Sequence, residues 1–289
     1  MIRYFETRSS RLRRLPQLRC VACDLDGTVL RGDGTVGEET RRAARQLMDA
    51  GVHVVLASGR TDGFTREFAR ELGTPAPVIS LNGALVIDGD GVPMHEDVLP
   101  AKLGKEILDL QQRGLDAYIS VFTASGIYVD TAAPLIPRYL RSHPEDIHHL
   151  DSISAMYDQA VMLVVAGAYS ILQQYSVTVS KRFGRKVQRT LYQSGGGGDR
   201  FYLELRNARA SKASGLEVVL RALAVPRHAS ASIGDYTNDI EMCKFTGVSA
   251  AMCNGTAELK GLADIVTTRT NDEDGVAEFF DMILTQRAV

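Results

Sequence analysis

Short, continuous apolar runs alternate with stretches of helical periodicity at both ends of the chain. Several runs stop abruptly at glycine and polar residues, as where Val21-Ala22-Cys23 meets Asp24. Apolar runs without alternating polar positions are typical of parallel strands that are covered on both faces. Between the runs, apolar residues recur every three or four positions, as in 64–72, and this spacing predicts amphipathic helices. The pattern therefore predicts an α/β fold built on a doubly wound parallel sheet.

The polar residues that end these runs are predicted to gather at one edge of the sheet. In a doubly wound sheet, ligands bind outside the carboxyl ends of the strands. We therefore expect carboxylates, a hydroxyl and an amide to converge there. The changes from apolar to polar residues lie at 21–28, 52–60, 78–83, 231–235, 248–255 and 265–272.

The middle of the chain has a different pattern and is predicted to form a second domain. Residues 85–207 alternate strands with charged helices, and none of these strands leads into a convergent polar cluster. We expect an inserted α/β cap over the ligand edge, which divides the core domain into residues 18–84 and 208–289. Residues 1–17 form a basic N-terminal extension, which fits an organelle-targeting peptide, a flexible tail or an added helix.

Composition narrows the class of partner. The 289 residues are 45% hydrophobic and 24% charged, as in ordinary soluble globular proteins. A formal net charge of −2 gives no reason to expect nucleic acid or an anionic membrane as a partner. No apolar run approaches the roughly 18 residues that span a bilayer. Four cysteines are too few for a disulfide scaffold in this length, so we expect a reducing, cytoplasmic location.

Cys20 and Cys23 form a C-x-x-C sequence, which we interpret as core packing. A zinc site would need a second pair of ligands at similar spacing, and Cys243 and Cys253 do not provide one. The pair also lies in an apolar stretch, where free cysteines behave as small apolar residues. Packing is therefore favoured over metal or redox chemistry.

Two features of the cap region suggest ligand sites only weakly. His143, His148 and His149 cluster near a Pro-Glu-Asp sequence, which favours a polar surface turn over metal ligation. The four glycines at 195–198 lack the following Lys-Ser/Thr of a nucleotide-binding loop. We interpret this run as a mobile hairpin loop inserted between cap strands.

Two carboxylates follow the first apolar run. Asp24 and Asp26 are two residues apart on an extended segment, so their side chains point to the same side. Their repulsion requires a proton or a nearby cation. A calcium loop would need an oxygen ligand at its fifth position and glycine at its sixth, where this chain has Thr28 and Val29. The sequence D-x-D-G also occurs in solvated turns, but its place after a buried strand favours a functional site.

Two further carboxylates follow a later strand. Asp235, Asp24 and the backbone carbonyl of Asp26 could form an all-oxygen site for Mg²⁺. Asp239 lies one helical turn beyond Asp235 and could be a ligand or support one. Asp235 and Asn238 could also cap the next helix, a role that is compatible with metal binding.

A lysine and a serine complete the candidate set. Lys212 precedes a predicted helix, where its charge opposes the local dipole and suits an anionic partner. Ser58 offers a hydroxyl at a strand end, although a simple Ser-Gly turn would explain it as well. Only Ser58 lies at a strand end, where the predicted sheet would bring it near the carboxylates.

These motifs together resemble those of the haloacid dehalogenase superfamily of phosphatases, in particular the Cof-like branch with a large inserted type IIB cap. The resemblance extends from about residue 20 to residue 280. One departure is Cys253, where the family usually has glycine. The motifs occur in order as Asp24-Leu25-Asp26-Gly27-Thr28, Ala57-Ser58-Gly59-Arg60, Ser211-Lys212-Ala213 and Gly234-Asp235 through Asn238-Asp239.

The resemblance implies a Rossmann-like core and a phosphatase that acts on phosphomonoesters of small metabolites, such as sugar phosphates or phosphorylated cofactors. Asp24 would attack phosphorus to form an aspartyl-phosphate, and Asp26 would serve as general acid and base. Ser58 and Lys212 would hold the transferring oxygens. One Mg²⁺, for which Mn²⁺ could substitute, would be held by Asp24, Asp26, Asp235 and Asp239. Contacts to phosphate or substrate are expected from Gly27, Thr28, Gly59, Arg60, Asn82, Gly83 and Asn238.

Two alternatives use the same core. A phosphomutase or phosphotransferase would share the aspartyl-phosphate chemistry and differ only in its product. A binding module that kept the fold without catalysis would be a different class of protein. The complete set of Asp24, Asp26, Ser58, Lys212 and Asp235 argues against the second alternative.

Overall fold

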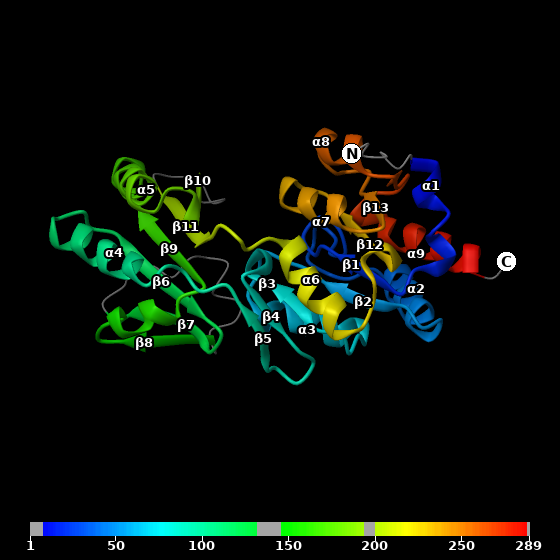
Figure 1. Ribbon diagram of the computed structural model, residues 1–289, viewed down its shortest axis with the longest axis horizontal. Coiled ribbons are helices and arrows are strands. Elements are labelled where there is room, and N and C mark those ends of the chain that lie inside the picture. The colour runs from blue at the N-terminus through cyan, green and yellow to red at the C-terminus, as the bar shows by residue number, and fades with distance from the viewer. Residues whose placement is uncertain (1–7, 132–145, 194–199, 288–289) are drawn as a thin grey trace, which may run out of the picture. The chain divides into compact units, whose positions relative to one another are not determined.

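The computed structural model describes residues 8–131, 146–193 and 200–287 of the chain. His143, the glycines at 195–198 and the first seven residues of the expected basic extension lie outside these ranges. The chain divides into two compact units (Figure 1), and the second is inserted into the first. The first unit comprises Met1–His95 with Ser211–Val289, and the second comprises Glu96–Ala210.

The first unit is built on a five-stranded parallel sheet with the order β14-β13-β12-β1-β2. Central β1 pairs with β12 on one side and β2 on the other, and Cys23 at its end aligns with Ile233 and Leu56. The residues that follow β1 and β12 therefore emerge side by side, because parallel strands share one carboxyl edge. The strands are β1 (Cys20–Cys23), β2 (His53–Leu56), β12 (Ser230–Gly234), β13 (Val248–Ala251) and β14 (Ile265–Val266).

Both faces of this sheet are covered. Cys20 and Ala22 of β1 pack with Leu216 in one apolar cluster, while alternation places Val21 and Cys23 on the opposite face, where they are also buried. This confirms the predicted doubly wound α/β core. The helices of the unit are α1 (Arg8–Leu12), α2 (Glu38–Asp49), α3 (Asp62–Leu72), α6 (Lys212–Ala222), α7 (Ile240–Phe245), α8 (Ala257–Leu262) and α9 (Gly275–Arg287).

Local sequence determines where these helices begin and end. The side chain of Ser211 accepts a hydrogen bond from the N–H of Ser214, and a reciprocal bond completes a capping box before α6. Helix α3 ends at Gly73, which adopts a left-handed conformation with φ of 74°. Lys212, the first residue of α6, is therefore fixed by the cap that precedes it.

The basic extension is partly folded against the first unit. Residues 8–17 include α1 and a short 3-10 helix at Leu15–Gln17, and the side chain of Leu15 is buried. Arg287 near the end of α9 donates a hydrogen bond to the carbonyl of Leu18 at 2.6 Å. Among the described residues, no helix combines the length and apolar character needed to cross a membrane.

A small three-stranded sheet of the first unit, in which β3 and β4 are antiparallel, determines where the insertion begins. It has the order β3-β4-β5, with β3 at Val78–Ser80, β4 at Leu85–Ile87 and β5 at Pro93–Glu96. Val86 of β4 belongs to the same apolar cluster as Cys20, so β4 is part of the core. The expected boundaries after residues 84 and 207 therefore differ from those in the structure, which lie after residues 95 and 210.

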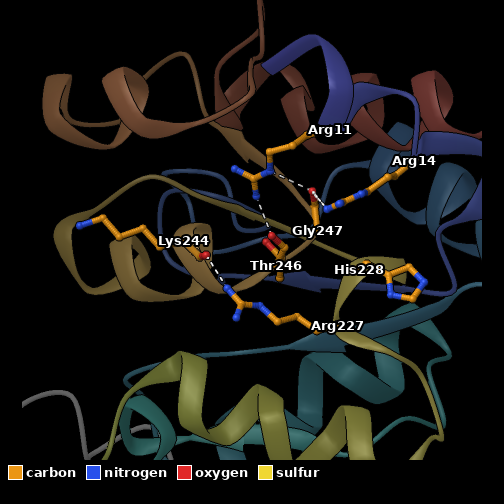
Figure 2. A pocket seen from close by; sticks show the side chains of 7 residues that line it. All are labelled: Arg11, Arg14, Arg227, His228, Lys244, Thr246 and Gly247. Atoms are coloured by element: carbon orange, nitrogen blue, oxygen red, sulfur yellow. Dashed lines mark hydrogen bonds between the residues drawn. The ribbon is translucent and has the colours of Figure 1, made fainter. Parts of the chain in front are cut away.

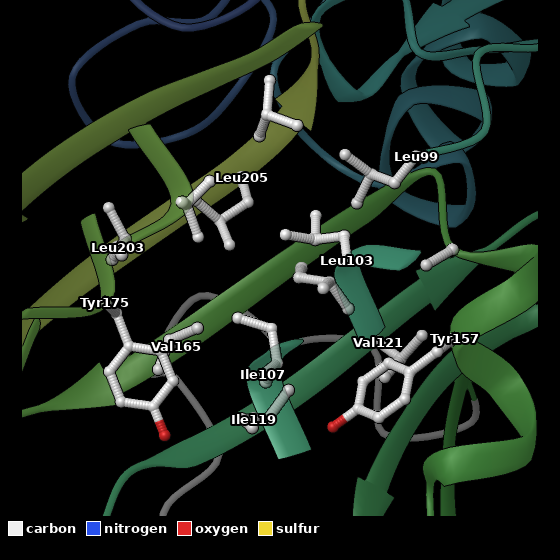
Figure 3. Close-up of a cluster of buried hydrophobic side chains, with 14 of the residues drawn as sticks. Leu99, Leu103, Ile107, Ile119, Val121, Tyr157, Val165, Tyr175, Leu203 and Leu205 are labelled. Atoms are coloured by element: carbon white, nitrogen blue, oxygen red, sulfur yellow. The ribbon is translucent and has the colours of Figure 1, made fainter. Parts of the chain in front are cut away.

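The second unit is an α/β domain with a six-stranded sheet of order β10-β11-β9-β6-β7-β8. Its neighbouring strands are antiparallel except for the parallel pair β7 and β8. Side chains of two helices pack on the sheet (Figure 3), including Ile107 and Tyr175 against Val165. The elements are α4 (Lys102–Gln112), β6 (Tyr118–Thr123), β7 (Gly126–Asp130), β8 (Ile147–Leu150), β9 (Met162–Gly167), α5 (Tyr169–Phe183), β10 (Val187–Gln193) and β11 (Phe201–Asn207).

Candidate active site

Asp24 lies directly after β1 and is almost fully buried at the carboxyl edge of the sheet. Its Oδ1 accepts a hydrogen bond from Nζ of Lys212, and its Oδ2 accepts one from Oγ1 of Thr28 at 3.2 Å. Lys212 has no exposed surface. The sheet and the start of α6 thus hold a carboxylate and an ammonium in direct contact away from bulk water.

Asp239 connects Lys212 to the loop after β12. Its Oδ1 accepts a hydrogen bond from Nζ of Lys212 at 2.7 Å. Its Oδ2 accepts from the backbone N–H groups of Asp235 at 3.0 Å and Tyr236 at 3.1 Å. One carboxylate therefore positions both the lysine and the turn that carries Asp235.

Three carboxylates form an acidic cluster in this unit. Oxygen atoms of Asp24, Asp235 and Asp239 all lie within 4.8 Å of one another. An oxygen-only set of donors suits a hard divalent cation such as Mg²⁺. With Lys212 included, three negative charges and one positive charge leave a net charge of −2, which one divalent cation would neutralise.

Burial and mutual repulsion both act against the ionised forms of two of these carboxylates. Burial raises the pKa of Asp24 well above its usual range, and the charge of Asp239 adds to the effect while Lys212 opposes it. Burial likewise raises the pKa of Asp235, with a further contribution from Asp239. Burial alone would lower the pKa of Lys212, but Asp24 and Asp239 outweigh it and raise that pKa. A bound cation would favour the ionised form of each carboxylate.

Asp26 is placed differently from the other carboxylates. Its side chain is half exposed and accepts hydrogen bonds from Arg60 Nε at 3.0 Å and Nη2 at 2.7 Å. The guanidinium of Arg60 lies over the ring of Phe64, 4.7 Å from its centroid. The side chain of Asp26 is not part of the acidic cluster, so any contribution to a metal site would come from its backbone carbonyl.

Ser58 lies at the end of the β2 segment and is fully buried. Its Oγ accepts a hydrogen bond from the N–H of Arg60 at 3.1 Å, and its carbonyl accepts one from the N–H of Asn82 at 2.9 Å. A Cβ at Gly59 would lie 2.9 Å from Nδ2 of Asn82, so glycine permits the two loops to approach. The structure therefore shows the Ser-Gly turn, in which the Ser58 hydroxyl accepts a hydrogen bond from Arg60.

Asn82 and Asn238 join two loops at the same edge. Asn82 has a φ of 54°, and its Oδ1 accepts a hydrogen bond from Nδ2 of Asn238 at 2.9 Å. Gly83 follows with a φ of 91°, and a side chain there would clash with the carbonyl oxygen of Ser211. Gly83 thus permits close packing beside α6.

Gly27 lies against the acidic cluster. It has a φ of 76°, and a Cβ at this position would lie 2.5 Å from Oδ2 of Asp235. Its carbonyl accepts a hydrogen bond from Nδ2 of Asn254 at 2.8 Å. Asn254 was not among the residues predicted for the site, although it follows β13 at the same carboxyl edge. That position after a strand is the signal that could have identified it.

The cysteine that departs from the family pattern is accommodated. The N–H of Cys253 donates to Oγ1 of Thr267 at 2.9 Å, and Asn254 keeps its bond to Gly27. Cys20 and Cys23 are fully buried free thiols, and burial raises the pKa of Cys20 to about 12. These thiols lie in the core, as the packing interpretation expects.

Comparisons with known proteins agree on one family. Residues 21–280 match the family described as haloacid dehalogenase-like hydrolase. The chain is 28% identical to the phosphatase YwpJ of Bacillus subtilis, over 92% of this chain and 100% of that protein. It is 25% identical to the 5-amino-6-(5-phospho-D-ribitylamino)uracil phosphatase YitU of the same organism, over 90% and 95% of the two chains. A haloacid dehalogenase-like hydrolase from Bacteroides thetaiotaomicron has a similar structure, with a TM-score of 0.79 and 26% identity over 92% and 99% of the chains.

Proposed function

This chain belongs to the haloacid dehalogenase-like hydrolase family and is a phosphatase of that family, and on this premise we propose that it uses Mg²⁺ and an aspartyl-phosphate intermediate to hydrolyse phosphomonoesters of small metabolites. The observation that carries the proposal is the contact of buried Lys212 with Asp24 inside a cluster of three carboxylates. This combination supplies a nucleophile, a fixed positive charge and donors for a cation at one place.

Asp24 is the proposed nucleophile. One of its carboxylate oxygens attacks phosphorus in line, the bond from phosphorus to the leaving oxygen breaks, and a mixed anhydride forms. Lys212 favours the ionised form of Asp24 and opposes the effect of burial. Water then attacks the phosphorus of the anhydride, which releases inorganic phosphate and restores the carboxylate.

Asp26 is the proposed general acid and base. It would protonate the leaving alkoxide and then accept a proton from the attacking water. In the structure both of its carboxylate oxygens accept hydrogen bonds from Arg60. We therefore expect Arg60 to leave Asp26 and contact substrate when a phosphoester binds.

The remaining residues would hold the phosphoryl group and the cation. Ser58 and Lys212 would stabilise charge on the transferring oxygens. Asp24 and Asp235, supported by Asp239, would hold Mg²⁺, which would offset the repulsion between the anionic nucleophile and the anionic substrate. Mn²⁺ fits the same oxygen donors.

The substrate class follows from the family rather than from a single residue. YitU is named for a phosphorylated ribitylamino pyrimidine, which is a small phosphomonoester. We propose substrates of this kind for the present chain, namely sugar phosphates or phosphorylated cofactors. The inserted second unit is the part of the chain expected to select among them.

A phosphate-release assay over a panel of such compounds tests the proposal. Activity should require Mg²⁺ and should be lost in Asp24→Asn, while exposed Asp49→Asn serves as the matched control. Rapid quenching should give wild-type protein a mass increase of one phosphoryl group on the peptide that contains Asp24. Turnover by Asp24→Asn at the wild-type rate would contradict the proposal, and an isomerised sugar phosphate as the product would favour the phosphomutase alternative.

A further inference from the structure

The turn that follows β13 contacts both loops at the acidic cluster. The N–H of Thr256 donates a hydrogen bond to the backbone carbonyl of Asp235 at 2.8 Å, and Nδ2 of Asn254 donates to the carbonyl of Gly27 at 2.8 Å. Between them, a Cβ at Gly255 would lie 3.0 Å from the carbonyl oxygen of Asp235, so glycine permits the turn to approach this backbone closely. The turn therefore joins the segment after β1 to the segment after β12.

The side chain of Asn254 is held in one orientation by two partners. Its Oδ1 accepts a hydrogen bond from the N–H of Asn271 at 3.0 Å, while its Nδ2 donates to Gly27. Nδ2 of Asn271 in turn donates to the carbonyl of Leu30 at 2.9 Å. An amide that uses its oxygen and its nitrogen in this way cannot turn over without losing both bonds. The loop after β1 is therefore tied at two points to later parts of the chain.

Strand β13, which leads into this turn, is also anchored at its start (Figure 2). Arg11 of the N-terminal segment donates from Nη2 to the carbonyl of Thr246 at 2.6 Å and from Nε to that of Gly247 at 3.0 Å. Arg11 also pairs with Asp264 at 3.2 Å. Asp264 accepts hydrogen bonds from the N–H and the Oγ of Ser249 in β13, both at 2.9 Å. The strand therefore provides a fixed base for the turn that follows it.

Gly27 connects this support to the proposed donors of the cation site. The peptide that joins it to Asp26 contains the backbone carbonyl expected to bind the cation, and the carbonyl of Gly27 itself is the one that Asn254 holds. Gly27 has a φ of 76°, and because it has no Cβ its backbone can lie directly against the carboxylate of Asp235. Movement of Gly27 would therefore change the spacing between two of the proposed oxygen donors.

Divalent cations differ in how much of this movement they tolerate. Mg²⁺ is small and demands nearly octahedral geometry, whereas Ca²⁺ accepts more oxygen ligands at longer distances in flexible arrangements. Donors that are held in a fixed frame can therefore favour the smaller ion, and donors that are free to relax lose this preference. Residues that orient metal ligands without binding the metal commonly change its affinity by about 10- to 100-fold.

We propose that Asn254 is a positioning residue that gives the acidic cluster a preference for Mg²⁺ over Ca²⁺. This inference rests on the proposed function, in which Asp24, Asp235 and the carbonyl of Asp26 bind the cation. Asn254 acts through Gly27, because its amide fixes the carbonyl of that residue and thereby the spacing of the donors. The backbone bond to Asp235 from the same turn does not depend on the side chain at position 254.

Calorimetric titration of the full-length protein with Mg²⁺ alone and with Ca²⁺ alone tests the proposal. The side chain of Asn254 is exposed, so Asn254→Ala leaves no buried cavity. This variant should weaken Mg²⁺ binding about tenfold and Ca²⁺ binding no more than about twofold. The ratio of the Mg²⁺ affinity to the Ca²⁺ affinity should therefore fall about fivefold or more.

Asn207→Ala is the matched control. Nδ2 of Asn207 also donates to a backbone carbonyl, that of Val98, at 2.8 Å, and its Oδ1 also accepts from a backbone N–H. The two alanine variants therefore lose the same kinds of hydrogen bond and should lose similar stability. Only Asn254→Ala should change the ratio of the two affinities, because Asn207 lies in the second unit.

Asn254→Asp separates geometry from charge. The aspartate keeps an acceptor for the N–H of Asn271 but places an oxygen opposite the carbonyl of Gly27, so the ratio should fall as it does in Asn254→Ala. The added negative charge attracts both divalent cations alike and leaves the ratio unaltered.

Three outcomes decide the proposal. A ratio that falls in both Asn254 variants, but not in Asn207→Ala, would support it. If Asp235→Asn weakens Mg²⁺ binding and yet Asn254→Ala keeps the wild-type ratio, the proposed cation site stands and the role of Asn254 is overturned. If Asp235→Asn binds Mg²⁺ as tightly as wild type, the cation binds elsewhere, and the proposed site and the role of Asn254 are both overturned.

Discussion

The carboxylate of Asp239 accepts a hydrogen bond from the ammonium of Lys212 at 2.7 Å, and both side chains are buried. Lys212 contacts Asp24 through the same nitrogen. A buried ammonium is tolerated only where carboxylates compensate for its lost hydration. Asp239 therefore affects both the stability of the fold and the position of the charge beside Asp24.

Replacing Asp239 with alanine should destabilise the protein by about 3 kcal/mol, because Lys212 keeps only one of its two buried partners. The N–H groups of Asp235 and Tyr236 also lose their acceptor. Denaturation by urea at neutral pH measures the change. Asp49→Ala, at an exposed position, should change stability by no more than about 0.5 kcal/mol. Equal denaturation midpoints for the two variants would show that the burial of Lys212 does not require Asp239 as a partner.

Magnesium should stabilise the metal-free protein against unfolding. At a Mg²⁺ concentration of one hundred times its dissociation constant, the free energy of unfolding should rise by about 2.7 kcal/mol. Asp235→Asn should be more stable than wild type in chelator, because it removes one of three repelling carboxylates. The same variant should respond much less to Mg²⁺. Thermal unfolding with and without Mg²⁺ measures both effects, and an unaltered response of Asp235→Asn would place the cation elsewhere.

Gly27→Ala and Gly34→Ala form a matched pair. Both glycines have left-handed backbone, with φ of 76° and 83°, so alanine should cost about 1 kcal/mol of stability at either site. Only the Cβ at Gly27 would meet the carboxylate of Asp235, whereas the space around Gly34 is open to 4 Å among the described atoms. We expect phosphatase activity to fall about 100-fold in Gly27→Ala alone. Steady-state kinetics measures the loss of activity, and urea denaturation measures the loss of stability that backbone strain causes in both variants. Equal activities of the two variants would show that Asp235 can move away from the new Cβ without loss of function.

The buried Tyr175 predicts a loss of stability at high pH. Burial raises its pKa from the ordinary value of 10.0 to about 12, and its hydroxyl donates to the carbonyl of Leu115 at 2.9 Å. The folded state holds this proton more tightly than the unfolded state. The protonated hydroxyl therefore makes its full contribution to the free energy of unfolding below pH 10, and this contribution is lost as pH rises toward 12. Tyr175→Phe should show a shallower decline over this interval, measured by urea denaturation. The partly exposed Tyr118→Phe is the control and should follow wild type.

The strand pattern predicted the location of the carboxylates well. Asp24 and Asp235 each follow an apolar run, and the pairing of β1 with β12 places them side by side. Lys212 does not follow a strand, so its contact with Asp24 depended on the family resemblance and on how α6 packs. The ion pair of Asp26 with Arg60 depends on side-chain conformation, which apolar periodicity does not determine.

The limits of the insertion were harder to predict because β4 and β5 have no distinctive polar ending. Strand β4 belongs to the core through packing, as the burial of Val86 with Cys20 shows, and β5 extends the sheet that contains β4. The role of Arg11 was equally hidden. A basic N-terminal stretch gives no sign that one arginine pairs with Asp264, more than two hundred residues away in the chain.

The close approach of Gly83 to Ser211 has a consequence for how such enzymes diversify. The chain returns from the insertion at Ser211, which packs against Gly83 of the first unit, and the next residue is Lys212. Whatever sequence is grafted between these ends, the lysine re-enters its helix at the same anchor. A change within the inserted unit can therefore leave the position of Lys212 in the first unit unaltered.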